Sequence, residues 1–158
     1  MKQRDGDPLA GRRRIFRAGL LLLAATQAGV GLWALAAPRS FYDGFPGAGR
    51  QWISALGPYD EHLVRDIGSS FTALVVLLVL AAVFLELRLV QAALAAWLVF
   101  VIPHFAYHLT TTEAYSLGDN VASLGGFALQ IAVPLVLLVL TMRPGEGRSS
   151  TRAAKASR

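Results

Sequence analysis

Four side chains in the middle of the chain have types and a spacing that suit metal binding. His62 and Asp66 are four residues apart, and so are His104 and His108. Residues four apart lie on one face of a helix, so each pair presents two ligands in the same direction. Zinc, copper and non-haem iron all accept three imidazoles and one carboxylate. The pattern predicts a metal site at His62, Asp66, His104 and His108.

The same residues allow two other interpretations. In the first they form a structural hydrogen-bonded network, because a polar side chain inside a membrane needs a partner. The partner of His104 would be Asp66, a hydroxyl of Ser69 or Ser70, or the backbone carbonyl that Pro103 frees. In the second they line a pocket for a haem, a quinone or another small ligand. The sequence leaves these interpretations and the metal site open.

Other charged residues near these pairs belong to the same polar cluster. Arg65 is expected to bind a lipid phosphate or to form an ion pair with Glu113 or Asp119. Asp119 and Asn120 are expected to cap the last membrane span. Asp60 is expected to cap the helix that carries His62.

The composition indicates a membrane protein. Of the 158 residues 54% are hydrophobic and only 16% are charged, and the mean hydropathy is +0.49. Soluble domains carry about 25% charged residues. The chain has no cysteine, which excludes disulfides, thiolate metal sites and a cysteine nucleophile. It also has no phosphate loop, no dinucleotide fingerprint and no HExxH motif.

Four apolar stretches must position the polar residues. They cover about residues 18–37, 67–85, 89–109 and 121–142. Each is long enough to cross a hydrocarbon core of about 30 Å. The predicted fold is therefore all-α, an integral membrane four-helix bundle formed by residues 15–142.

Basic residues set the expected orientation. Twelve of the 15 lie before the first span, between the second and third, or after the fourth. The positive-inside rule then places both termini in the cytoplasm of a multi-pass plasma-membrane protein. A cleavable signal peptide ending at Ala34-Leu35-Ala36 is the alternative for the first span. The length of that apolar run and the nearby Pro38 argue against it.

The segments outside the spans are of two kinds. Residues 38–66 form a 29-residue outer loop, and its aromatic and apolar side chains predict a structured segment that covers the bundle mouth. Residues 1–14 and 143–158 are expected to be disordered basic tails that contact anionic lipid headgroups. No aromatic residues are interleaved with their charges, so nucleic acid is not an expected partner.

Two features predict how the spans pack. Small residues occur four apart in three spans and would let helix backbones approach closely. The pairs are Ala24 and Ala28, Ala25 and Gly29, Ala92 and Ala96, and Ala122 and Gly126. Pro134 has no N–H to donate, so it should kink its span or free the carbonyl of Gln130.

Two motifs carry a resemblance to known sequences. They are His62-Leu63-Val64-Arg65-Asp66-Ile67-Gly68 and Pro103-His104 followed by His108. With the Leu-rich spans around them, they resemble small uncharacterised actinobacterial four-helix membrane proteins that are distantly similar to the DoxX-like superfamily. The resemblance covers about residues 18–142. It implies a membrane location and a helical bundle, and DoxX-like relatives are associated with quinone-linked redox systems.

The sequence favours a non-enzymatic accessory or interaction subunit, with a protein partner or a second copy of the chain as its binding partner. A redox-linked, metal- or quinone-binding protein that uses the same cluster is the alternative.

Overall fold

Four long helices dominate the computed structural model, which describes residues 8–143. They are α1 (Arg13–Ala36), α3 (Glu61–Phe84), α4 (Leu87–Thr110) and α5 (Leu117–Met142). Each is long and apolar enough to cross a membrane. This confirms the all-α, multi-pass architecture predicted from the sequence.

Shorter elements connect the long helices. Between α1 and α3 lie α2 (Pro38–Gly44), β1 (Pro46–Gly47), β2 (Arg50–Gln51) and the 3-10 helix η1 (Ser54–Leu56). The two strands pair antiparallel and form a small hairpin. A second 3-10 helix, η2 (Thr112–Ala114), joins α4 to α5.

Two of the helices, α3 and α5, begin before the predicted apolar spans, at residues that follow a polar cap. The carboxylate of Asp60 accepts a hydrogen bond from the N–H of Leu63 at 3.1 Å, which confirms its predicted capping role. The prediction that Asp119 and Asn120 cap α5 was wrong, since the helix is capped by Ser116. Its hydroxyl accepts from the N–H of Asp119 at 3.1 Å and donates to the Asp119 carboxylate at 2.6 Å.

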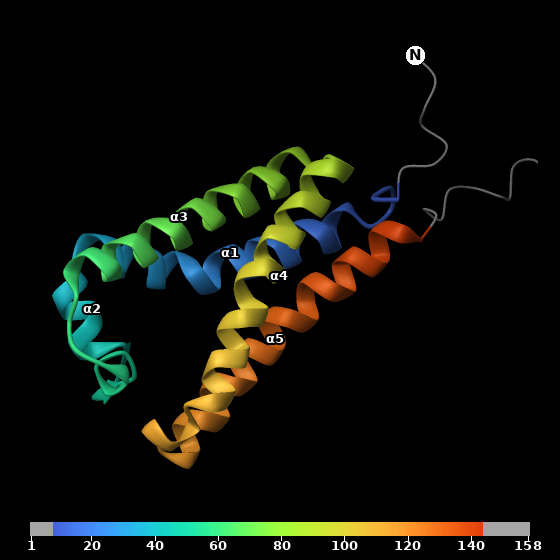
Figure 1. Cartoon of the computed structure of the whole chain (residues 1–158). Helices are drawn as coiled ribbons and strands as arrows, with labels where there is room; N and C mark the ends of the chain where they lie inside the picture. Colours follow the sequence, from blue (N-terminus) through green and yellow to red (C-terminus); the bar gives the residue numbers. More distant parts are fainter. Residues whose placement is uncertain (1–7, 144–158) are drawn as a thin grey trace, which may run out of the picture.

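The long helices form two antiparallel pairs, α1 with α3 and α4 with α5 (Figure 1). The pairs lie together where α1 begins and α5 ends, which we call the terminal end. They diverge toward the opposite end, which carries α2, the hairpin and η2 and which we call the loop end. Leu85, in the left-handed conformation at φ 50°, makes the short turn from α3 to α4 at the terminal end.

Large apolar side chains fill the terminal half of the bundle. Trp97, Phe16, Leu20 and Leu94 are fully buried there. Leu9 is also fully buried in this core. It lies in the predicted tail 1–14, and α1 begins at Arg13, so residues 9–14 belong to the folded part. The remaining parts of the predicted tails, residues 1–7 and 144–158, lie outside the described residues.

Backbone contact joins α1 to α3 at two glycines. A Cβ on Gly68 would lie 2.5 Å from the backbone nitrogen of Leu35, and one on Gly31 would lie 2.9 Å from the Cβ of Phe71. Neither position has room for a side chain. At Gly29 and Gly126 the small-residue prediction was wrong, because a Cβ there would meet no atom within 4 Å.

The segment between α1 and α3 contains α2, the hairpin and η1. Phe41 is 3% exposed, and its ring contacts those of Trp33 and Phe45. Together with Ala34 and Val64 they form a second, smaller core. This segment covers the loop end of the α1/α3 pair. It ends at Asp60, six residues earlier than predicted, because α3 begins at Glu61.

Candidate functional site

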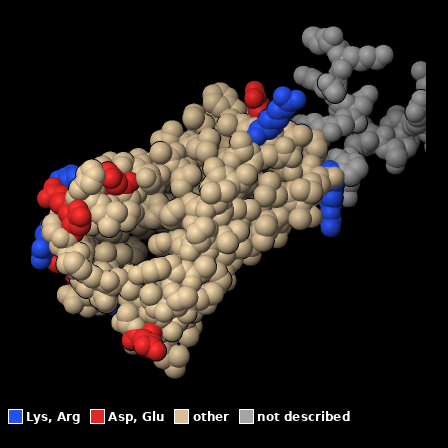
Figure 2. Space-filling model, viewed as in Figure 1, with Lys and Arg blue, Asp and Glu red and all other residues tan. Residues whose placement is uncertain are grey.

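A cavity of about 540 Å³ lies where the two helix pairs diverge. Its walls come from all four long helices and from the segment between α1 and α3. Figure 2 shows this face of the molecule hollowed toward the loop end, with acidic and basic side chains around that end. Binding sites for small molecules have volumes of about 300–1,000 Å³, so the cavity has the size of a ligand site.

Two glutamines on facing helices form a hydrogen bond at the cavity. The side-chain amide of Gln27 on α1 donates to the side-chain oxygen of Gln130 on α5 at 2.8 Å. Both residues line the cavity. This bond links the α1/α3 pair to the α4/α5 pair at the level where they begin to diverge.

The backbone carbonyl of Gln130 also accepts a hydrogen bond. The donor is the indole N–H of Trp97, at 2.9 Å. Pro134 lies four residues later in α5 and cannot donate to this carbonyl. The prediction that Pro134 frees the Gln130 carbonyl is therefore confirmed, and Trp97 is the group that satisfies it.

Three residues that line the cavity each have a buried polar atom with no hydrogen-bond partner within residues 8–143. The atoms are Oε1 of Gln27, Nδ1 of His108 and the indole Nε1 of Trp52. Gln27 is 6% exposed and His108 is 9% exposed. Polar atoms buried in this way cost free energy unless a partner satisfies them. A bound molecule with a hydrogen-bonding group can supply that partner.

His104 and His108 share one face of α4, as predicted, and lie among aromatic rings. Their ring centroids are 4.9 Å apart, and each lies 4.9 Å from the ring of Phe127 on α5. His104 also stacks on Phe100 at 5.3 Å, and His108 stacks on Tyr115 at 6.1 Å. The two imidazoles are thus part of the aromatic lining of the cavity.

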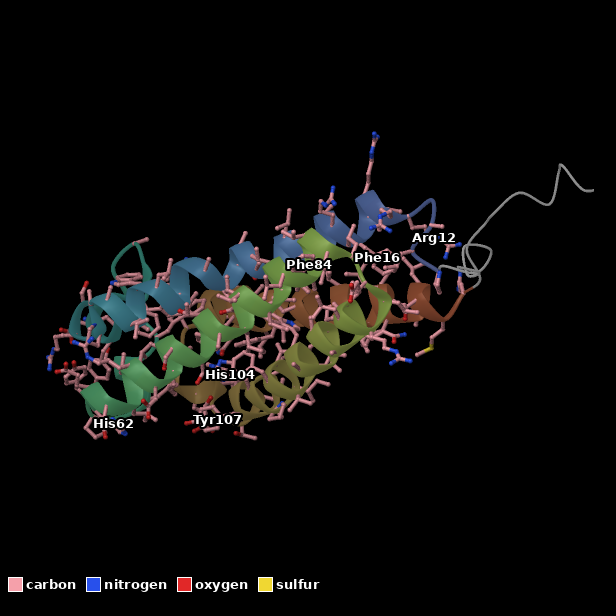
Figure 3. The ribbon with its side chains drawn as sticks, turned by 90° about the horizontal axis from the view of Figure 1, so that it is seen from above. Arg12, Phe16, His62, Phe84, His104 and Tyr107 are labelled. Carbon is pink, nitrogen blue, oxygen red and sulfur yellow. The ribbon has the colours of Figure 1, made fainter. Side chains whose placement is uncertain are left out.

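His62 and Asp66 do not join this group. Nε2 of His62 lies 3.3 Å from the Asp66 carboxylate, and both side chains are mainly exposed at the start of α3. Figure 3 shows His62 at the loop end of α3, where the helix begins, apart from His104 and Tyr107. In the described part of the chain no three His, Asp or Glu side chains are placed to hold a metal ion. The predicted juxtaposition fails because α3 diverges from α4 toward the loop end.

Arg65 and Asp119, from the predicted polar cluster, also have separate partners. Arg65 pairs with Glu61 at 2.9 Å and donates to the backbone carbonyl of Leu35 at 2.8 Å. Asp119 pairs with Arg50 at 3.1 Å. Glu113 lies exposed in η2. The expected pairing of Arg65 with Glu113 or Asp119 was therefore wrong, because Arg65 faces α1 and its own helix.

Two contacts close the cavity at the loop end. The Arg50–Asp119 pair ties the hairpin to α5. The Tyr115 hydroxyl, before α5, donates to the backbone carbonyl of Trp52 at 2.8 Å. Burial raises the pKa of the Tyr115 phenol to about 12, which keeps this donor protonated at neutral pH. These bonds hold the segment between α1 and α3 over the cavity as a cover.

The side chains of the two glutamines were not predicted as site residues from the sequence. Gln27 and Gln130 are uncharged, so they did not stand out beside the histidines, yet both interrupt apolar spans. A polar side chain at membrane depth needs a partner, which is the signal that would have identified them.

No protein-family model, no curated protein and no solved structure matches the chain. The resemblance to DoxX-like proteins and the activity it implies therefore stay predictions.

Proposed function

We propose that this membrane protein binds a small, mainly apolar molecule in the cavity at its loop end. The observation that carries the proposal is the cavity whose lining residues have buried polar atoms without a partner in the described chain, among them Oε1 of Gln27 and Nδ1 of His108. Apolar walls with a few converging polar groups are typical of small-molecule sites.

The polar groups favour a particular kind of ligand. Oε1 of Gln27 is a hydrogen-bond acceptor, so the ligand should carry a hydroxyl or another donor. The aromatic lining at Phe100, His104 and Phe127 favours a flat ring system. A reduced quinone meets both conditions, and it represents the redox-linked alternative from the sequence. The accessory role stays a prediction.

A matched pair of variants tests the binding site. Gly125 and Gly126 are neighbours on α5, and a Cβ at either would meet no atom within 4 Å, but only Gly126 lines the cavity. In lipid nanodiscs 1-naphthol, which has a ring and a hydroxyl, should raise the melting temperature of the native protein and of Gly125→Leu. It should not raise that of Gly126→Leu, in which the new side chain fills the cavity.

Naphthalene serves as the control ligand, because it lacks the hydroxyl. It should stabilise the native protein less than 1-naphthol does, and Gln27→Leu should remove the difference. Equal shifts for native protein, Gly125→Leu and Gly126→Leu would mean that the probe acts through the bilayer and would refute the site. Menadione, before and after reduction, tests the quinone in the same assay.

We also propose that both termini lie in the cytoplasm, which places the loop end outside the cell. The division of basic residues supports this orientation. A reporter that is active only outside the cytoplasm should work when inserted near Gly47 or Ser116 and fail when fused to either terminus. Activity at the C-terminus would contradict it.

A further inference from the structure

The sides of the cavity differ in how they are closed. The Gln27–Gln130 bond joins α1 to α5, and the Arg50–Asp119 and Tyr115–Trp52 bonds hold the cover. Between the loop-end halves of α3 and α4, by contrast, the described residues form no hydrogen bond or ion pair. The face that Figure 2 shows as hollowed is the one on which α3 and α4 diverge.

The edges of this gap are apolar and exposed, although they also line the cavity. Leu63 and Ile67 on α3 are 56% and 40% exposed, and Tyr107 on α4 is 49% exposed. The rings of Phe71 and Phe100 meet at 4.9 Å and close the gap toward the terminal end. The opening thus extends from the ends of the helices to a depth of about three helical turns, because Phe71 and Phe100 each lie ten residues from the loop end of their helix.

An opening at this depth faces lipid when the four helices cross a membrane. Ile67 and Phe71 lie in the apolar part of α3, and Phe100 and His104 lie in the apolar part of α4. A water-soluble ligand would instead need a path through the cover, where the Arg50–Asp119 and Tyr115–Trp52 bonds lie.

From this geometry we infer that the ligand is a membrane-dissolved lipophile, which enters sideways between α3 and α4 from the leaflet at the loop end. The inference rests on the proposed function, because it names the class of molecule that the same cavity receives. The ring and hydroxyl enter to meet Gln27 and His108, while a hydrocarbon tail remains in the lipid beside Leu63 and Ile67.

The absence of cysteine from the chain allows a test by single-cysteine labelling. Ser123 lines the cavity and is 9% exposed, so Ser123→Cys places one thiol inside it. The full chain in nanodiscs is treated with an N-alkyl maleimide that dissolves in the bilayer, or with a charged sulfonatoethyl methanethiosulfonate in water. Val99→Cys, on the lipid-facing surface, and Gln51→Cys, in the hairpin, give the reference rates.

Bulky side chains at the gap then test the route. Ile67→Trp or Leu63→Trp, each combined with Ser123→Cys, should slow the alkyl maleimide about tenfold, which corresponds to an added barrier of about 1.4 kcal/mol. Val76→Trp is the matched control, because Val76 is an exposed apolar residue of α3 that does not line the cavity. Thermal unfolding of each variant verifies that it is folded.

The outcomes separate this inference from the proposed function. Fast labelling by the alkyl maleimide, slowed at Ile67 and Leu63 but not at Val76, supports lateral entry. Labelling by the charged reagent at an equal or higher rate, with no effect of the tryptophans, overturns lateral entry and keeps the cavity. If neither reagent reaches Ser123→Cys while both reference cysteines react, the cavity is closed and both proposals fail.

Discussion

The two helix pairs are held together in different ways. In α1/α3 the backbones touch, since Gly31 and Gly68 leave no room for a side chain. In α4/α5 side chains make the contacts, through the Trp97–Gln130 bond and a 3.1 Å bond from Gln91 to Thr141. A Cβ added at Gly125 or Gly126 of α5 would meet no atom within 4 Å. Glycine in a membrane span is therefore no reliable sign of a helix contact, whereas the carbonyl that Pro134 frees does have a donor on the neighbouring helix.

The difference between the pairs predicts that a side chain at Gly68 has the largest effect on stability. Gly68→Leu would drive a carbon against the backbone of Leu35, which cannot rotate away. We expect a loss of about 3 kcal/mol or more in the free energy of unfolding, at or above the usual cost of overpacking. Unfolding in mixed micelles measures this. Gly29→Leu on α1 is the control and should change stability little, so equal losses would contradict backbone contact at Gly68.

The second prediction concerns the α4/α5 pair. Trp97→Phe removes the donor to the Gln130 carbonyl and should cost about 1–3 kcal/mol. In a Pro134→Ala background the cost should be smaller, because the alanine has a backbone N–H that can donate to that carbonyl. The same unfolding assay applies. Trp33→Phe, which loses only a 3.2 Å bond to the exposed Ser40 hydroxyl, should cost less. Additive effects of the Trp97 and Pro134 substitutions would argue against the shared carbonyl.

The third prediction tests the link between the pairs by double-mutant cycles. Gln27→Leu and Gln130→Leu should couple by about 0.6 kcal/mol, the average for polar contacts between membrane helices. His104→Ala and Asp66→Ala should be additive, because Asp66 pairs with His62 instead. Coupling of His104 to Asp66, or a metal lost together with either residue, would restore the network or the metal site predicted from the sequence.

The last prediction concerns the cover, where the expected effect is also small. Tyr115→Phe removes the bond to Trp52 and should cost about 0.5–1.5 kcal/mol. The pKa of Tyr115 is about 12 in the folded chain and about 10 when unfolded, so stability from the protonated phenol should fall as the pH rises from about 10 to about 12. Tyrosinate absorbance measures the titration. In Tyr42→Phe the tyrosinate titration near pH 12 should remain. If that titration also remains in Tyr115→Phe, it does not belong to Tyr115.

The sequence determined the parts of this protein that depend on local order. Four long apolar runs predicted the spanning helices, because a membrane requires every backbone group to be bonded within its own helix. Asp60 before α3 and Pro134 within α5 predicted a cap and a freed carbonyl, since both effects act within one turn.

Only the tertiary structure decided which helices pair, and with that which polar residues meet. The spacing of His62, Asp66, His104 and His108 in the sequence is the same whether α3 lies along α4 or diverges from it. The sequence therefore could not show that the pair on α3 lies apart from the pair on α4. Steric fit at Gly31 and Gly68 pairs α3 with α1 and draws its loop end away from α4. That divergence leaves His104 and His108 beside a cavity that Gln27 and Gln130 also line, because the separation of two helices depends on packing along their whole length.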